Sequence, residues 1–184
     1  MELNTKRILF REITVDDIPK IHQLNLIPEV DKYNTLGIPE NLEVTQNIIN
    51  PLIAAKQQIP RERYIWKMEN KEGNFIGLFG LNKGKPNYLN AEIWYKFFPV
   101  YWNKGFATEA VKGVLNFCFI ELKLHRIIAG CATENIGSLR VLEKAGFMKE
   151  AHHRKILPIR GEWVDNYEFA ILEENYFKSI TDHD

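Results

Sequence analysis

A polar turn that leads into a helix-forming pattern combines residue types able to hold a phosphate group. It lies in the segment YWNKGFATEAV. The first N–H groups of a helix lack intrahelical partners, and the helix dipole adds partial positive charge there. Gly105 lets an anion approach the backbone closely, and Lys104 adds a cation. We therefore predict a pyrophosphate cradle formed by Asn103, Lys104, Gly105, Phe106, Ala107 and Thr108.

A second interpretation of this turn stays open. Short glycine-containing segments often do no more than lead a loop into a helix, and residues 103–108 allow that equally well. Two other phosphate-binding patterns are excluded, because the chain contains no GxxxxGK[ST] and no GxGxxG after a strand.

Length and composition indicate one globular domain over residues 1–184. Apolar residues make up 45% of the chain, which is enough for a substantial core. No linker, repeat or low-complexity segment marks a boundary. The 24 basic residues balance the 24 acidic ones, so no overall charge favours a nucleic acid or an anionic membrane as partner.

The cysteines and histidines give no sign of a metal site. Cys118 and Cys131 lie in apolar stretches, which favours buried thiols over a disulfide. His152 and His153 would point to opposite faces of a strand and lack an accompanying ligand cluster. The first residues form no long apolar run, and no window has the length of a transmembrane helix. We therefore expect a cytoplasmic protein without a metal.

The elements that must position the polar turn follow from hydrophobic periodicity. Helices are predicted after Thr14 and over 42–57, 105–122 and 135–146. Seven strands are predicted over 7–13, 63–70, 74–81, 88–98, 126–133, 147–157 and 162–172. Short turns make the early strands antiparallel, whereas the helix 105–122 is a crossover between two parallel strands. The expected fold class is α/β (α+β), a mixed, mostly antiparallel sheet with helices on both faces.

Two segments, AEIWYKFFPVYWNKGFATEAV and LKLHRIIAGCATENIGSLRVLEKAGF, resemble the GNAT family of acyl-CoA N-acyltransferases. They are most similar to the branch of the ribosomal-protein N-terminal acetyltransferases. That branch shows an aromatic-Trp-x-Lys-Gly-Tyr/Phe-Ala-Thr-Glu-Ala segment, then Asn-x-x-Ser and then Lys-x-Gly-Phe. The match is dense from Ala91 to Phe147. Trp94 and Asn103 depart from it, because the branch often has glycine there; Asn103 can adopt the same backbone, whereas Trp94 is expected to reshape the acceptor cleft.

The resemblance implies a single GNAT domain that binds acetyl-CoA as cosubstrate. The helix after Gly105 would hold the pyrophosphate through the backbone amides of residues 103–108. The central strand before it would splay from its parallel neighbour. The pantetheine arm would lie in that gap and pair with backbone groups near Phe97 and Phe98. Asn135 would contact the same arm.

The implied reaction is acyl transfer, in which a neutral amine attacks the thioester, an oxyanion forms and CoA thiolate leaves. Ser138 matches the family position that can protonate the thiolate; otherwise it is only a small residue in a first helical turn. Glu92 matches the pattern of a carboxylate that takes the amine proton through a water; otherwise it is a solvated strand carboxylate. Backbone N–H groups of the splayed strand would stabilise the oxyanion.

Two classes of function fit these residues. The first is an acetyl-CoA-dependent N-acetyltransferase, favoured by the phosphate segment together with Asn135 and Ser138. The alternative is a non-catalytic CoA-binding or interaction domain with the same fold. The acceptor would be a small-molecule amine or a protein N-terminus, and the loops that would select it, 29–40 and 155–165, are not conspicuously acidic. A homodimer stays open, and no nucleic-acid or membrane partner is expected.

Overall fold

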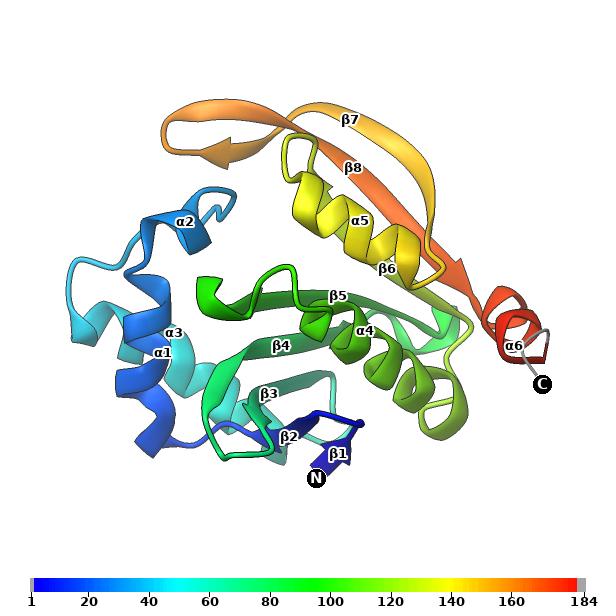
Figure 1. Ribbon diagram of the computed structural model, residues 1–184, viewed down its shortest axis with the longest axis horizontal. Coiled ribbons are helices and arrows are strands. Elements are labelled where there is room, and N and C mark those ends of the chain that lie inside the picture. Colours follow the sequence, from blue (N-terminus) through cyan, green and yellow to red (C-terminus); the bar gives the residue numbers. More distant parts are fainter. Residues whose placement is uncertain (1, 182–184) are drawn as a thin grey trace.

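The computed structural model describes residues 2–181 and forms one eight-stranded sheet in the order β1-β2-β3-β4-β5-β6-β8-β7 (Figure 1). The strands are β1 Glu2–Asn4, β2 Ile8–Glu12, β3 Arg63–Asn70, β4 Phe75–Lys83, β5 Asn90–Phe97, β6 Arg126–Ala132, β7 Met148–Ile159 and β8 Glu162–Leu172. The helices are α1 Ile18–Asn25, α2 Pro28–Asp31, α3 Leu42–Ala54, α4 Phe106–Asn116, α5 Ile136–Lys144 and α6 Glu173–Thr181.

The predicted fold class is confirmed, with corrections at the edges. The sheet is mostly antiparallel with one parallel pair, β5 and β6, as the crossover helix requires. It has eight strands rather than seven, because the three-residue β1 is too short to show an alternating pattern. The helices α2 and α6 were not predicted. The helix predicted to reach residue 122 ends at Asn116 and continues as a π-helical turn, Phe117–Glu121.

The parallel pair β5–β6 is joined over only three residue pairs. These are Asn90↔Arg126, Ala91↔Ile127 and Glu92↔Ile128. Beyond them β5 continues to Phe97 beside β4 alone, while β6 continues beside β8. Figure 1 shows the β6–β8–β7 side of the sheet turning away from β5. The splayed parallel pair is therefore present, and its gap begins after Glu92.

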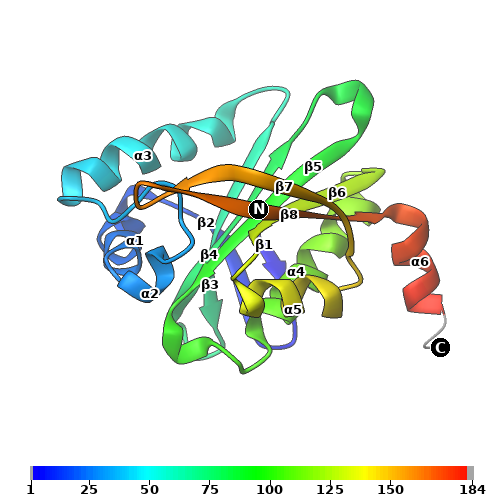
Figure 2. The same ribbon diagram turned by 90° about the horizontal axis from the view of Figure 1, so that it is seen from above.

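Each face of the sheet carries its own apolar core. Alternate residues of β5, such as Ala91, Ile93 and Phe97, belong to the larger core together with Val114 of α4. The other face carries a smaller core around Ile18, Ile21 and Leu24 of α1 and Ile49 of α3. Figure 2 shows α1 and α3 on one side of the strands and α4 and α5 on the other. The two helical layers hold β5 in place where β6 no longer supports it.

Hydrogen bonds connect α2 and the residues just after it to segments far away in the chain. Arg160, in the β7–β8 turn, donates from Nη2 to Pro28 O at 3.1 Å and lies 3.5 Å from Asp31 Oδ2. Tyr33 OH donates to Glu134 O, just before α5, at 3.0 Å. The segment around α2 therefore bridges the two parts of the sheet that separate at the gap.

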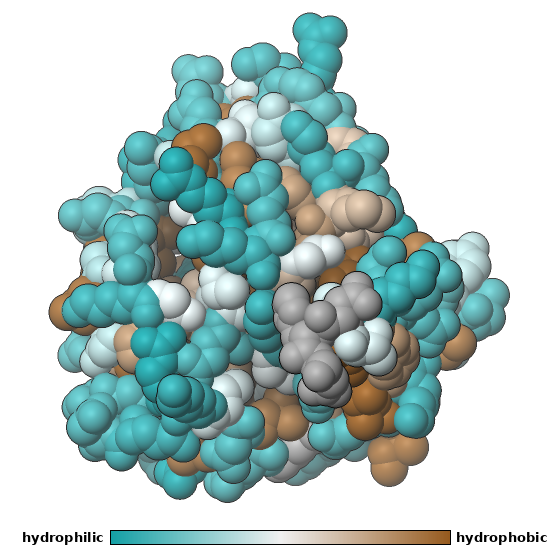
Figure 3. All heavy atoms as spheres, turned by 45° about the vertical axis from the view of Figure 1, so that its right-hand side comes forward, coloured by the Kyte–Doolittle hydropathy of each residue, from teal (hydrophilic) through white to brown (hydrophobic). Residues whose placement is uncertain are grey.

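The cysteines are buried, and the surface shows no large apolar band in the view of Figure 3. Cys118 and Cys131 are free and buried, as predicted. Figure 3 shows hydrophobic patches scattered between hydrophilic residues on the face that it displays. Within residues 2–181, no helix combines the length and apolar character that crossing a membrane would require.

Phe79→Ala tests the larger core at its centre. Phe79 is fully buried, with ring centroids 6.1 Å from Phe10 and 5.8 Å from Tyr95. We expect the free energy of unfolding to fall by about 3–5 kcal/mol, because the lost ring leaves a cavity. Urea unfolding followed by circular dichroism measures the change. Val15→Ala, at a side chain 61% exposed, is the matched control, and an equally small change in both variants would contradict the assignment.

Candidate active site

The loop before α4 enters the helix through two left-handed residues. Asn103 has φ 57° and Gly105, the N-cap of α4, has φ 79°. Asparagine and glycine are the residues that adopt this conformation at least cost. No side chain of residues 2–181 caps the start of α4. The N–H groups of its first turn therefore stay available to a ligand, in the place where the sequence predicts the cradle.

Arg7 and Glu109 fix this loop through hydrogen bonds. Neither residue was singled out from the sequence. Arg7 Nη1 donates to Lys104 O at 2.9 Å, and Arg7 Nε donates to Glu109 Oε2 at 2.6 Å. Glu109 Oε1 accepts from Arg7 N at 2.6 Å and from Thr5 Oγ1 at 2.7 Å. Burial alone would raise the pKa of Glu109, but the hydrogen bonds from Thr5 and Arg7 outweigh it and lower the pKa. The carboxylate therefore remains charged and paired.

The backbone of β5 faces the gap with alternate residues. Phe98 N donates to Ile76 O of β4 at 3.0 Å, so the neighbouring residue, Phe97, directs its backbone groups toward β6. The same alternation turns the N–H and C=O groups of Tyr95 and Ile93 toward the gap. Phe97 O already accepts from Trp102 Nε1 at 2.9 Å. The pairing of Glu92 with Ile128 engages the Ile93 N–H, so within residues 2–181 the open groups along this edge are the C=O of Ile93, both groups of Tyr95 and the N–H of Phe97.

Phe98 offers less to a ligand than the sequence suggests. Its N–H is bonded to β4, and its carbonyl accepts from Tyr101 N at 2.9 Å. Its ring packs edge-on against Phe75, with centroids 5.9 Å apart. Both backbone groups of Phe98 are therefore engaged within the protein.

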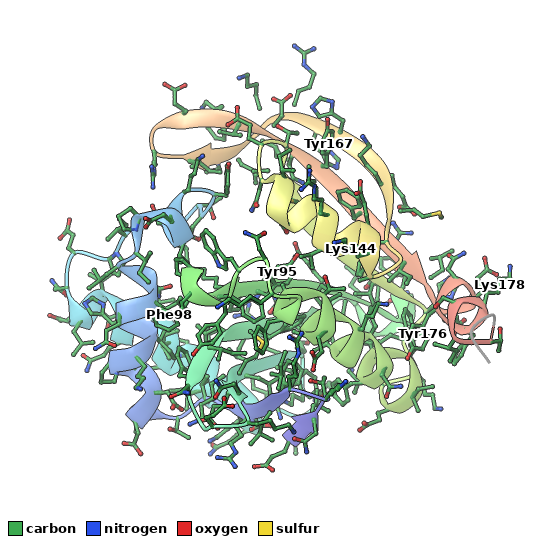
Figure 4. The ribbon with its side chains drawn as sticks, in the orientation of Figure 1. Tyr95, Phe98, Lys144, Tyr167, Tyr176 and Lys178 are labelled. Atoms are coloured by element: carbon green, nitrogen blue, oxygen red, sulfur yellow. The ribbon has the colours of Figure 1, made fainter. Side chains whose placement is uncertain are left out.

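Ser138 lies next to a tyrosine of β5 at the start of α5. Its Oγ is 2.8 Å from Tyr95 OH, and its backbone N–H donates to Asn135 Oδ1 at 3.2 Å. Asn135 is therefore the N-cap of α5, and its side-chain Nδ2 makes no hydrogen bond within residues 2–181. Burial raises the pKa of Tyr95, so its hydroxyl stays protonated near neutral pH. Figure 4 shows Tyr95 between β5 and α5. The contact with Tyr95 was not foreseen, because the two residues come from different elements.

Glu92 lies on the opposite face of the sheet from Ser138. It is the last residue of β5 that pairs with β6, and it shares its face with Trp94 and Phe98, which pack toward α1. Its side chain is exposed, yet partial desolvation and the nearby carboxylate of Glu168 raise its pKa. A carboxylate and a pair of hydrogen-bonded hydroxyl groups thus lie on the two faces of the sheet beside the gap.

Two further side chains of β5 occupy the Glu92 face. Lys96 Nζ donates to Asn25 Oδ1 of α1 at 3.1 Å, and burial lowers the pKa of Lys96 while Asp31 partly opposes that shift. Trp94 is accommodated by Gly80 of β4, where a methyl group would lie only 2.1 Å from the indole. The bulky side chain that departs from the family pattern therefore lies over β4.

Residues 7–148 match the profile of the acetyltransferase (GNAT) domain. The chain belongs to the GNAT family. It is 35% identical over 178 residues to the uncharacterized N-acetyltransferase YnaD of Bacillus subtilis (strain 168), covering 96% of this chain and 99% of the relative. The chain is accordingly an N-acetyltransferase.

Solved structures of the family superpose closely. A GNAT acetyltransferase from Bacillus anthracis has a TM-score of 0.82 at 35% identity, covering 95% of this chain and 99% of that one. The spermidine N-acetyltransferase of Vibrio cholerae, solved in complex with CoA and spermine, has a TM-score of 0.83 at 25% identity. That comparison covers 94% of this chain and 99% of the Vibrio chain.

Glu168→Gln tests the electrostatics of the Glu92 face. Removing the nearby negative charge should lower the pKa of Glu92, while desolvation still keeps it above the ordinary value. The carboxyl ¹³C shift of Glu92, followed by NMR across pH, measures this. Glu162→Gln, at the exposed first residue of β8, should leave the pKa of Glu92 unchanged. A Glu92 titration insensitive to Glu168→Gln would show that the two carboxylates do not interact.

Proposed function

We propose that this chain transfers an acetyl group from acetyl-CoA to an amine by direct attack on the thioester. The observation that carries the proposal is the gap between β5 and β6. It exposes unpaired backbone groups in the middle of a sheet, with a helix N-terminus nearby and candidate proton-transfer groups on both faces. An extended amide-containing arm would satisfy such an edge in the manner of an added strand.

The cosubstrate would run from the α4 N-terminus into the gap. The first-turn amides of Phe106, Ala107 and Thr108, together with the 103–105 turn, would bind the pyrophosphate. The pantetheine amides would pair with the open groups of Tyr95 and Phe97, because those of Phe98 are already engaged. At the start of α5, the side-chain Nδ2 of Asn135 would donate a hydrogen bond to the arm.

The two proton transfers would occur on opposite faces of the sheet, one at Glu92 and the other at Ser138. The acceptor amine would approach from the α1 face, lose a proton to Glu92 through a water and form the new N–C bond. Backbone N–H groups of β5 would stabilise the oxyanion. As the C–S bond breaks, the thiolate would take a proton from Ser138, whose oxygen is hydrogen-bonded to the neutral Tyr95 hydroxyl. Holding both substrates in place would supply much of the rate.

The acceptor we favour is a small cationic amine. The carboxylates of Glu92 and Glu168 lie close enough to affect one another, so they would attract a positive group beside the gap. The similarity to a spermidine N-acetyltransferase supports polyamines as the first acceptors to test. Lys96, on the same face, would oppose a long polycation that extends toward α1. A cytoplasmic location remains a prediction, and the assembly state and a protein N-terminus as acceptor stay open.

The function is tested by release of CoA thiol from acetyl-CoA with a panel of amines. Spermidine, spermine, a free amino acid and a short peptide with an unblocked N-terminus form the panel, and mass spectrometry identifies the acetylated product. Release that depends on one amine class supports the proposal. Binding of CoA by calorimetry without thiol release for any amine would favour the non-catalytic alternative.

Ser138→Ala should lower kcat by roughly ten- to a hundredfold and change the KM for acetyl-CoA much less, because the hydroxyl acts as the thiolate forms. Tyr95→Phe keeps Ser138 but removes the hydroxyl that is hydrogen-bonded to it, so kcat should fall less in Tyr95→Phe than in Ser138→Ala. Steady-state kinetics with the best acceptor measures both. Unchanged turnover in Ser138→Ala would mean that the thiolate leaves without this residue.

Glu92→Gln should reduce turnover most near neutral pH, with partial recovery at higher pH. The base works only when ionised, so wild-type activity should rise as pH passes the raised pKa of Glu92. The variant lacks that group and depends on the fraction of acceptor amine that is already neutral, which grows with pH. Rates measured from pH 5 to 10 compare the two, with Glu162→Gln as control. An equal loss at every pH would indicate a positional role instead.

A further inference from the structure

Arg7 makes contacts of three kinds with the start of α4, although it lies 102 residues from Glu109 in the sequence. It is paired with Glu109 through its backbone N–H and through Nε, and it bonds Lys104 O through Nη1. Its guanidinium also lies 4.3 Å from the centre of the Phe106 ring. The contacts converge on the residues that flank Gly105.

The bond to Lys104 O fixes the orientation of one peptide group. In a trans peptide the C=O and the following N–H point in opposite directions. With its carbonyl held by Arg7, the Lys104–Gly105 peptide turns the Gly105 N–H away from Arg7. Glycine at φ 79° tolerates several orientations of this peptide, so the donor direction depends on an external contact.

Arg7 also balances the negative charge of Glu109 at the start of α4. Glu109 lies in the first turn of α4, where a carboxylate stabilises the helix but would repel a bound anion. Its ion pair with Arg7 offsets that repulsion. Arg7 Nη2 makes no hydrogen bond within residues 2–181, and it lies 3.3 Å from the place that a methyl group on Gly105 would take. One edge of the cation therefore remains beside the helix N-terminus.

The same position is open to solvent. A groove of about 670 Å³ runs along the outer side of α4 and is lined by Thr5, Gly105, Thr108 and Glu109 together with Lys112 and Lys144. An anionic group can therefore reach the loop that Arg7 holds.

We propose that Arg7, fixed by Glu109, is a positioning residue that directs the Gly105 N–H toward the pyrophosphate of the cosubstrate and offsets the negative charge of Glu109 beside it. The inference rests on the proposed use of acetyl-CoA. It assigns to the turn between β1 and β2 a part in cosubstrate affinity, separate from the proton transfers at Ser138 and Glu92. Lysine cannot replace Arg7, because an ammonium lacks the fork that reaches Glu109 and Lys104 at once.

The test compares Arg7→Lys with Arg11→Lys. Arg11 is an arginine of β2 whose ion pairs, with Glu2 and Glu69, do not involve the α4 loop. We expect Arg7→Lys to raise the Kd for CoA, and the KM for acetyl-CoA, by roughly tenfold, the scale of one charge-assisted hydrogen bond. The value of kcat should stay within about twofold, since chemistry occurs elsewhere. Arg11→Lys should match wild type.

S-acetylpantetheine, which lacks the pyrophosphate, separates positioning from a general structural role. Its kcat/KM should be the same in Arg7→Lys and wild type, so the preference for acetyl-CoA should shrink roughly tenfold. Glu109→Asp keeps the negative charge but is one methylene shorter, so it should hold Arg7 less well and give a selective loss in the same direction; it serves as the second test where Arg7→Lys does not fold by circular dichroism.

The outcomes distinguish this inference from the function on which it rests. Wild-type protein that binds no CoA in calorimetry overturns both. Wild-type protein that binds CoA, with folded variants of unchanged affinity, overturns the role of Arg7 alone. An equal loss with acetyl-CoA and S-acetylpantetheine also overturns it, because the pyrophosphate would then not be the group concerned.

Discussion

The separation of β5 from β6 is the constraint on which the rest of the structure depends. A sheet normally satisfies every backbone group of its central strands, and unpaired groups there are costly when buried. Here two central strands pair over three residues and then diverge. Each strand is still held by its other neighbour: β5 pairs with β4, and β6 pairs with β8, over seven residue pairs each. The gap is therefore built into the fold and can be filled without disturbing either half of the sheet.

One strand supplies both faces of the candidate site because its side chains alternate. Tyr95 extends toward α5 and meets Ser138, whereas Glu92 and Lys96 extend toward the side of α1. Burial shifts these groups in different directions, raising the pKa of Tyr95 and lowering that of Lys96. The sheet itself thereby separates a neutral hydroxyl pair from the ionisable groups. This separation suits a reaction in which one proton leaves an amine and another reaches a thiolate.

Local patterns were readable from the sequence, and long-range pairings were not. The turn before α4 was found because its glycine, lysine and helical periodicity are adjacent in the chain, and the parallel pair followed from the crossover helix. The face of Glu92 required the register of β5. The position of the Trp94 ring could not be predicted, because Gly80, which makes room for it on β4, is distant in the sequence. Arg7 and Glu109 are 102 residues apart, and no periodicity connects them. The edge strand β1 was missed because three residues are too few for an alternating pattern.

The Arg7–Glu109 contact also connects the N-terminal edge of the sheet to the candidate site. β1 pairs with β2 over three residues and forms one edge of the sheet. Such a short edge would fray easily by itself. The hydrogen bonds from Thr5 and Arg7 to Glu109 attach the β1–β2 turn to α4 instead. A ligand that binds the α4 N-terminus only when the loop is held in this way stabilises the attached edge by the same free energy. Order at the N-terminal edge and affinity at the helix N-terminus are then two measures of one equilibrium, although Arg7 and Glu109 are 102 positions apart in the chain.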